Sequence, residues 1–204
     1  MVAFIMSVYE GLGIHQSFLL HLLTSITFTF GLVFTVVTIG RVVDLFEFGQ
    51  MKLLSRLFNV KVASFICDRL TFPGVVIHEL SHALFIWAAG GKIVRIRLLS
   101  LGLDGRLGYV DFRPRGSKLQ RSCQLAFGSC APVLIGLLLE IIFSYLIFRL
   151  TLPLWANIFI VYLAISVFNH MSMSSADMKN YFKGMVFVFP IITTIVMARI
   201  YFFM

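Results

Sequence analysis

The sequence is short of charged residues. Asp, Glu, Lys and Arg make up 13% of its 204 residues, whereas 59% are apolar. This composition excludes an ordinary soluble domain, in which about a quarter of the residues are charged. It is typical of a chain with several membrane-spanning helices. We therefore predict an all-α polytopic membrane protein.

Five apolar windows are long enough, or nearly long enough, to cross a bilayer, since a spanning helix needs about 20 residues. They lie at residues 17–39, 70–90, 122–148, 154–170 and 184–204. Residues 154–170 are marginal in length unless that helix continues into the polar segment after it. We expect about five transmembrane helices.

The sequence also has few cysteines and no evident cleavable signal peptide. Cys67, Cys123 and Cys130 are odd in number and lie in or near the windows, which excludes a disulfide framework and favours buried thiols. The first sixteen residues lack Lys and Arg, so we expect a permanent first span in place of a cleavable signal peptide.

The apolar windows form one membrane domain over residues 1–204 in this prediction. Its parts are a first span with an interfacial segment (1–69), a core (70–184) and a C-terminal span (185–204). No loop is long enough for an added substrate-binding domain. Substrate selection is then left to the spans, a hairpin or a separate partner.

Basic residues outnumber acidic ones and give a net charge of +8. Eight of the 17 Lys and Arg residues fall between Lys92 and Arg121. In a membrane protein such a basic segment favours the cytoplasmic side of the bilayer. This rule accounts for the positive charge, so we expect contact with the lipid bilayer and no nucleic acid partner. Residues 40–69 then lie outside, where alternating basic and apolar side chains predict an interfacial amphipathic helix.

The second window, "TFPGVVIHELSHALFIWAAGG", carries ionisable residues at its centre. His78, Glu79 and His82 form the pattern H-E-x-x-H. On a helix, positions four apart share a face, so the two imidazoles can bind one Zn²⁺ ion while Glu79 reaches the adjacent water as a general base. The alternative is a pair of neutral packing histidines with Glu79 paired to an arginine. Burying three such groups is costly, which favours a metal site.

A catalytic zinc site takes a third protein ligand. Asp104 is one candidate, but "KIVRIRLLSLGLDGRLGYVDFRP" alternates basic and apolar residues on both sides of an Asp-Gly pair. That pattern predicts a β-hairpin over residues 92–113, at the cytoplasmic interface, with Asp104 in its turn. We do not expect a turn residue to return to the middle of the membrane.

A further segment, "NHMSMSSADMKN", follows the fourth window, and "FGSCAPVLIG" lies in the third. With the H-E-x-x-H helix and the hairpin, these segments resemble the site-2 protease family of intramembrane zinc metalloproteases. That family carries N-x-x-P-x-P-x-L-D-G on a later span. Asn169 precedes Asp177 by the same interval, and Ser172 and Ser174 stand where the family has prolines. The resemblance covers residues 71–184 and fits a small, divergent member.

The resemblance implies that Asp177 completes the zinc site. The predicted topology agrees, because it places His82 and Asp177 toward the same half of the membrane. Asp177 could instead be the N-cap of a helix beginning near Met178. His170 is the rival third ligand, or an interfacial or supporting residue. Asn169 is expected to donate a hydrogen bond to the substrate backbone or the developing oxyanion.

The resemblance also implies an activity. It predicts a zinc-dependent endopeptidase that cleaves membrane-embedded peptides or single-span proteins, in a prokaryotic plasma membrane, with the active site toward the cytoplasmic side. The alternatives are a zinc-binding or transport protein and an inactive relative that binds membrane segments. Glu140 is the one acidic residue deep in another span, which counts against a transport path. The oligomeric state stays open.

Overall fold

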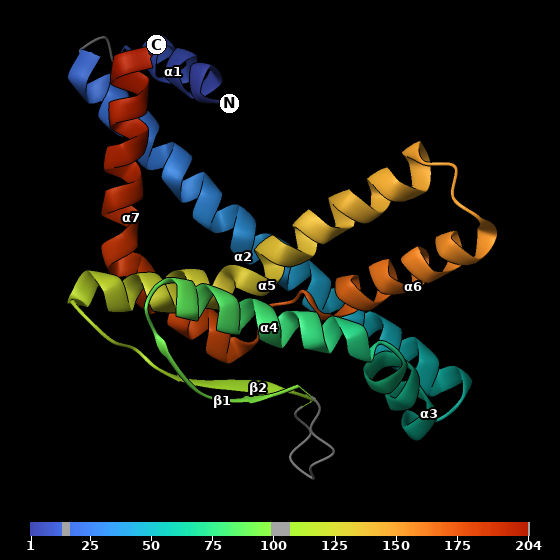
Figure 1. The fold of residues 1–204 in the computed structure, drawn as a ribbon. Helices are drawn as coiled ribbons and strands as arrows, with labels where there is room; N and C mark the ends of the chain where they lie inside the picture. Colours follow the sequence, from blue (N-terminus) through green and yellow to red (C-terminus); the bar gives the residue numbers. More distant parts are fainter. Residues whose placement is uncertain (14–16, 99–106, 204) are drawn as a thin grey trace.

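The computed structural model describes residues 1–13, 17–98 and 107–203 (Figure 1). The chain is mostly helical, with one small two-stranded antiparallel sheet. In chain order the elements are α1 (Val2–Gly11), α2 (Ser17–Leu57), α3 (Val60–Ser64), the π-helical turn η1 (Phe65–Leu70), α4 (Phe72–Ala88), β1 (Lys92–Arg97), β2 (Tyr109–Arg113), α5 (Lys118–Arg149), α6 (Leu154–His170) and α7 (Ser175–Phe203).

Three of the described helices, α2, α5 and α7, are long and apolar enough to cross a membrane. They indicate a membrane protein. The helices α4 and α6 are apolar but have only 17 residues each, or about 25 Å at the helical rise. The predicted bounds of α6 are confirmed, while the predicted count of about five spans is not established.

Two helices extend beyond the predicted apolar windows. The first window ends at residue 39, but the helix α2 continues to Leu57, with Arg41 and Asp44 paired at 3.2 Å on its surface. The last window begins at residue 184, but the helix α7 begins at Ser175. Asp177 therefore lies in the first turn of the last helix, and only residues 171–174 connect α6 to α7.

The predicted hairpin is confirmed, with one irregularity in the pairing between Ile93 and Arg95. Gly90, at φ +80°, ends α4 and turns the chain into β1. Both strands then contact α4, so the hairpin runs back along this helix (Figure 1). Residues 99–106, with the predicted turn and Asp104, lie outside the described residues.

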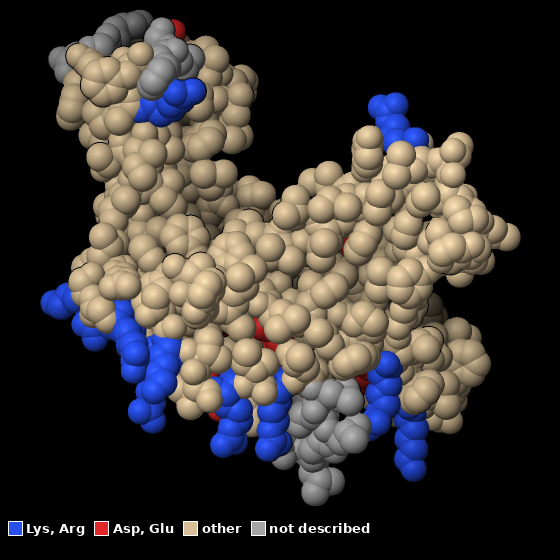
Figure 2. Space-filling model, in the orientation of Figure 1, with Lys and Arg blue, Asp and Glu red and all other residues tan. Residues whose placement is uncertain are grey.

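Basic side chains gather along one edge of the molecule. Figure 2 shows Lys and Arg mainly along the lower edge, where Figure 1 places the hairpin and α3. The sequence predicted opposite sides of the membrane for these two segments. Their common edge favours the same side.

The core of the molecule lies where α5 and α7 cross. Cys130 and Tyr181 belong to its cluster of buried side chains. Cys67 is also buried, Cys123 is partly buried, and all three cysteines are free thiols. A Cβ on Gly184 would lie 2.5 Å from backbone atoms of α5, so this glycine allows α7 to approach α5 closely.

Candidate metal centre

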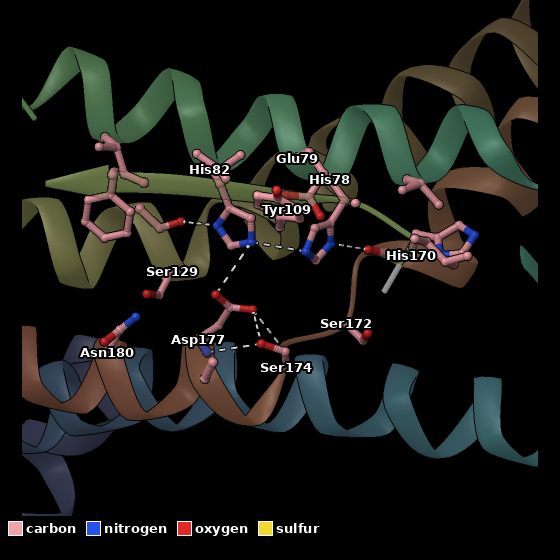
Figure 3. Close-up of a pocket in the computed structure, with 18 of the residues that line it drawn as sticks. His78, Glu79, His82, Tyr109, Ser129, His170, Ser172, Ser174, Asp177 and Asn180 are labelled. Carbon is pink, nitrogen blue, oxygen red and sulfur yellow. Dashed lines mark hydrogen bonds and ion pairs between the residues drawn. The ribbon is translucent and has the colours of Figure 1, made fainter. Parts of the chain in front are cut away.

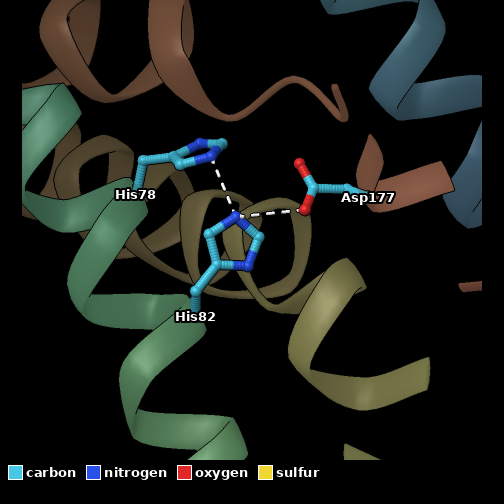
Figure 4. Close-up of side chains that lie close together, drawn as sticks. All are labelled: His78, His82 and Asp177. Atoms are coloured by element: carbon cyan, nitrogen blue, oxygen red, sulfur yellow. Dashed lines mark hydrogen bonds and ion pairs between the residues drawn. The ribbon is translucent and has the colours of Figure 1, made fainter. Parts of the chain in front are cut away.

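Two histidines of α4 present one nitrogen each to the same cavity. His78 and His82 lie one turn apart on one face of the helix. The Nδ1 atom of His78 is 2.5 Å from the carbonyl oxygen of His170, and Nδ1 of His82 is 2.7 Å from the carbonyl oxygen of Gly128. These contacts turn the two Nε2 atoms toward each other, at 3.0 Å (Figure 4).

The same contacts determine where the imidazole protons lie. A carbonyl oxygen only accepts hydrogen bonds, so Nδ1 of each neutral ring must carry the proton. Each Nε2 atom then offers a lone pair, and the two lone pairs face each other at 3.0 Å. Because such lone pairs repel, the arrangement is suited to a cation between them. Histidines that bind metals are oriented in this way by a carbonyl or carboxylate on the other nitrogen.

Asp177 approaches the histidines from α7. Its Oδ2 atom accepts hydrogen bonds from the backbone N–H of Ser174, at 3.2 Å, and from the Ser174 hydroxyl, at 2.5 Å. The backbone N–H of Asp177 donates a hydrogen bond to the hydroxyl oxygen (Oγ) of Ser174 at 3.1 Å. This reciprocal pair is a capping box at the start of the helix. It leaves Oδ1 facing the histidines, 3.6 Å from Nε2 of His82.

Asp177 is not the N-cap that the sequence offered as an alternative, because α7 begins at Ser175 and Ser174 caps it. One carboxylate oxygen helps Ser174 to cap α7, and the other completes a group that can hold a metal ion. His78, His82 and Asp177 each offer one ligand atom, and these atoms lie within 4.8 Å of one another. Two neutral imidazoles and a carboxylate are a donor set that catalytic zinc sites use, with the fourth position left for water.

Glu79 lies beside this ligand cluster, in a cavity of about 520 Å³ (Figure 3). The side chain of Glu79 is buried, and it lies next to the hairpin. A Cβ on Gly108 would be 2.8 Å from Cγ of Glu79, so only glycine allows the chain entering β2 to come this close. Glu79, whose carboxylate can take a proton from water, thus lies beside both the candidate metal ligands and the hairpin.

The hairpin contributes consecutive residues to the cavity wall. Residues 107–112 all line it. The side chains of a strand alternate between its two faces. Because consecutive residues all line the cavity, the backbone edge of the strand faces it. In the described part of the chain, β2 pairs only with β1, which leaves this edge without a strand partner.

The two other predicted site residues have different surroundings. His170 lines the cavity, but its Nε2 atom is 2.8 Å from the Thr71 hydroxyl, and its contribution to the cluster is the carbonyl oxygen that orients His78. Asn169 lines a separate apolar groove between α2, η1 and α6. The structure therefore brings His78, His82 and Asp177 together and does not bring Asn169 to them.

Further polar residues without a predicted role line the cavity, among them Glu47, Ser129 and Asn180. Asn180 could have been found from the sequence, because it follows Asp177 by three residues and so shares its helix face. Glu47 could not, since it lies in the segment 40–69, which was expected on the other side of the membrane. Ser129 lies in the segment "FGSCAPVLIG", but nothing in that segment shows which side chain faces the site.

The chain was compared with protein-family models, curated proteins and solved structures. No protein-family model, curated protein or solved structure matches the chain. The likeness to the site-2 protease family therefore rests on its motif residues and stays a prediction.

Proposed function

We propose that the chain is a zinc-dependent intramembrane endopeptidase that hydrolyses peptide bonds in or near the membrane segments of peptides or single-span proteins. The observation that carries this proposal is the convergence of two Nε2 lone pairs and one carboxylate oxygen beside a buried glutamate. The long apolar helices around the site support a substrate that is itself embedded in the membrane.

The metal ion would be held by His78, His82 and Asp177. When bound, zinc supplies Lewis acidity, which lowers the pKa of water and polarises a carbonyl group. Glu79 takes the proton of the attacking water and returns it to the amine of the broken peptide bond. The carbonyl oxygens of Gly128 and His170 keep both imidazoles in the tautomer that binds the ion.

The free edge of β2 provides a place for the substrate backbone. A peptide bond in a membrane helix is protected because its polar groups are already bonded within the helix, so cleavage requires local unwinding. An unwound segment can pair with β2 as an added strand. Because residues 107–112 line the cavity, such a strand would run along the metal ligands and Glu79.

The test compares purified wild-type protein with Glu79→Gln and Glu140→Gln in detergent. The substrate is a panel of single-span peptides with a central glycine, and the readouts are fragment mass and zinc content. Glu79→Gln should bind zinc like the wild type but release no fragments, because the proton acceptor is lost. Glu140 lies on α5 outside the cavity, so Glu140→Gln should keep the activity.

Full activity of Glu79→Gln would contradict the proposed chemistry. Loss of zinc in that variant would show instead that Glu79 is needed to build the metal site.

A further inference from the structure

Most polar side chains in the cavity already have a partner within the protein; Ser174 and His170 are examples. Ser129 and Asn180 differ. Both line the cavity, and neither makes a hydrogen bond to any other residue that the structure describes. Figure 3 shows the two side chains pointing into the cavity, Ser129 from α5 and Asn180 from α7.

The missing partners are informative because both side chains face the cavity. Ser129 is only 5% exposed, and Asn180 is half-buried. Their polar atoms are reached from the cavity, so a molecule bound there can accept hydrogen bonds that no described residue takes. Two such donors in one cavity point to a ligand with a hydrogen-bond acceptor.

Both donors are held in register with the metal ligands. Ser129 directly follows Gly128, whose carbonyl oxygen orients His82. Asn180 lies one turn beyond Asp177 on the same face of α7. Their helices are locked together by the close approach at Gly184, where a Cβ would meet the backbone of α5 at 2.5 Å. The position of the two donors relative to the cluster is therefore fixed.

Their place in the cavity differs from that of Glu79. In Figure 3, His82 lies between Ser129 on one side and His78 with Glu79 on the other. A water activated by Glu79 and a group bound by Ser129 and Asn180 would thus occupy different sides of the ligand cluster. A hydrolase needs both functions, one to activate the attacking water and one to hold the oxygen of the attacked carbonyl.

We propose that the Ser129 hydroxyl and the Asn180 amide donate hydrogen bonds to the carbonyl oxygen of the peptide bond to be cleaved. This inference rests on the proposed function, because it assigns the same cavity to a peptide. Donors aimed at an oxygen that gains negative charge in the transition state accelerate acyl transfer. Asn180 thereby takes the role that the sequence suggested for Asn169, whose side chain faces another groove.

The test measures equilibrium binding of N-acetyl-leucyl-leucine hydroxamate, which chelates metals and carries a carbonyl oxygen, to the zinc-loaded full-length protein in detergent. Asn180→Ala, Asn180→Asp and Ser129→Ala should each weaken binding by about tenfold, as expected for one lost hydrogen bond. Their zinc content should equal that of the wild type. Asn157→Ala and Ser175→Ala, which change residues outside the cavity lining, should bind the hydroxamate normally.

Equal hydroxamate affinity in all variants would overturn the inference. So would a parallel loss of zinc, since it would make the two residues supports of the metal site, and so would a wild type that binds no hydroxamate. Peptide cleavage separates the two proposals. If the wild type binds hydroxamate through these donors but cleaves no peptide, the proposed function fails alone. If it cleaves, the variants should lower kcat by about 10²-fold and leave KM nearly unchanged.

Discussion

Ser174 and Asp177 hold each other through three hydrogen bonds at the start of α7. In the family that the chain resembles, a proline stands at the position of Ser174. Here the serine directs the chain into the helix by capping it, and the capping bonds also orient the carboxylate that faces the histidines. One pair of residues therefore supplies both the helix start and the carboxylate geometry.

The variant Ser174→Ala tests this pairing. Without the hydroxyl, Asp177 is less well oriented, and we expect zinc affinity to fall by about 10 to 100-fold, as for other residues that support a metal ligand. Competition with a zinc-selective chelator measures the change. Ser175→Ala is the matched control, because Ser175 is exposed and takes no part in the capping box. Unchanged affinity in Ser174→Ala would show that the capping bonds do not prepare the ligand.

At the scale of elements, α2 packs against the short segment between α6 and α7. A Cβ on Gly40 would lie 2.9 Å from Cγ of Met173, a fully buried side chain of that segment. Phe46 of α2 packs edge-on against Phe168 of α6, with ring centroids 5.4 Å apart. The helix α2 therefore helps to hold the connection that carries Asp177 to the histidines.

We expect Gly40→Ala to lower the melting temperature and zinc affinity, because Met173 cannot move away without disturbing the core. Gly31→Ala, on the same helix, is the control, since nothing lies within 4 Å of its added methyl group. Alanine stabilises a helix by about 0.5–1 kcal/mol relative to glycine, so the control should be neutral or stabilising. Thermal unfolding and chelator competition give both quantities. Equal behaviour of the two variants would exclude a positioning role for α2.

The helical elements and most of the ligand cluster could be predicted from local sequence. Apolar composition indicates helices, and four-residue spacing places His78 and His82 on one face. The bounds of α2 and α7 could not be predicted, because hydropathy reports where a chain leaves an apolar environment and not where its helix ends. The direction of Asn169 could not be predicted either, since at the end of α6 it depends on how that helix packs against α2 and η1.

At the scale of the whole molecule, the basic edge bears on topology. Figure 2 places most visible Lys and Arg side chains along the edge that carries α3 and the hairpin. We expect cysteines introduced by Lys61→Cys and Arg113→Cys to react from the same side of sealed vesicles with a membrane-impermeant maleimide. Arg149→Cys, at the end of α5, should react from the other side. The wild type, with its buried or partly buried thiols, gives the background.

Labelling of Lys61→Cys and Arg113→Cys from opposite sides would restore the topology predicted from the sequence. It would also mean that α4 crosses the membrane in spite of its 17 residues.

The central claim is that His78, His82 and Asp177 form one metal site, and metal content tests it most directly. Zinc per chain should be measured by mass spectrometry on purified wild type, Asp177→Ala, His170→Ala and Asp104→Ala. We predict one zinc ion per chain in the wild type, its loss in Asp177→Ala, and its retention in the other two variants. Retention in Asp177→Ala, or loss in Asp104→Ala alone, would contradict the assigned ligands.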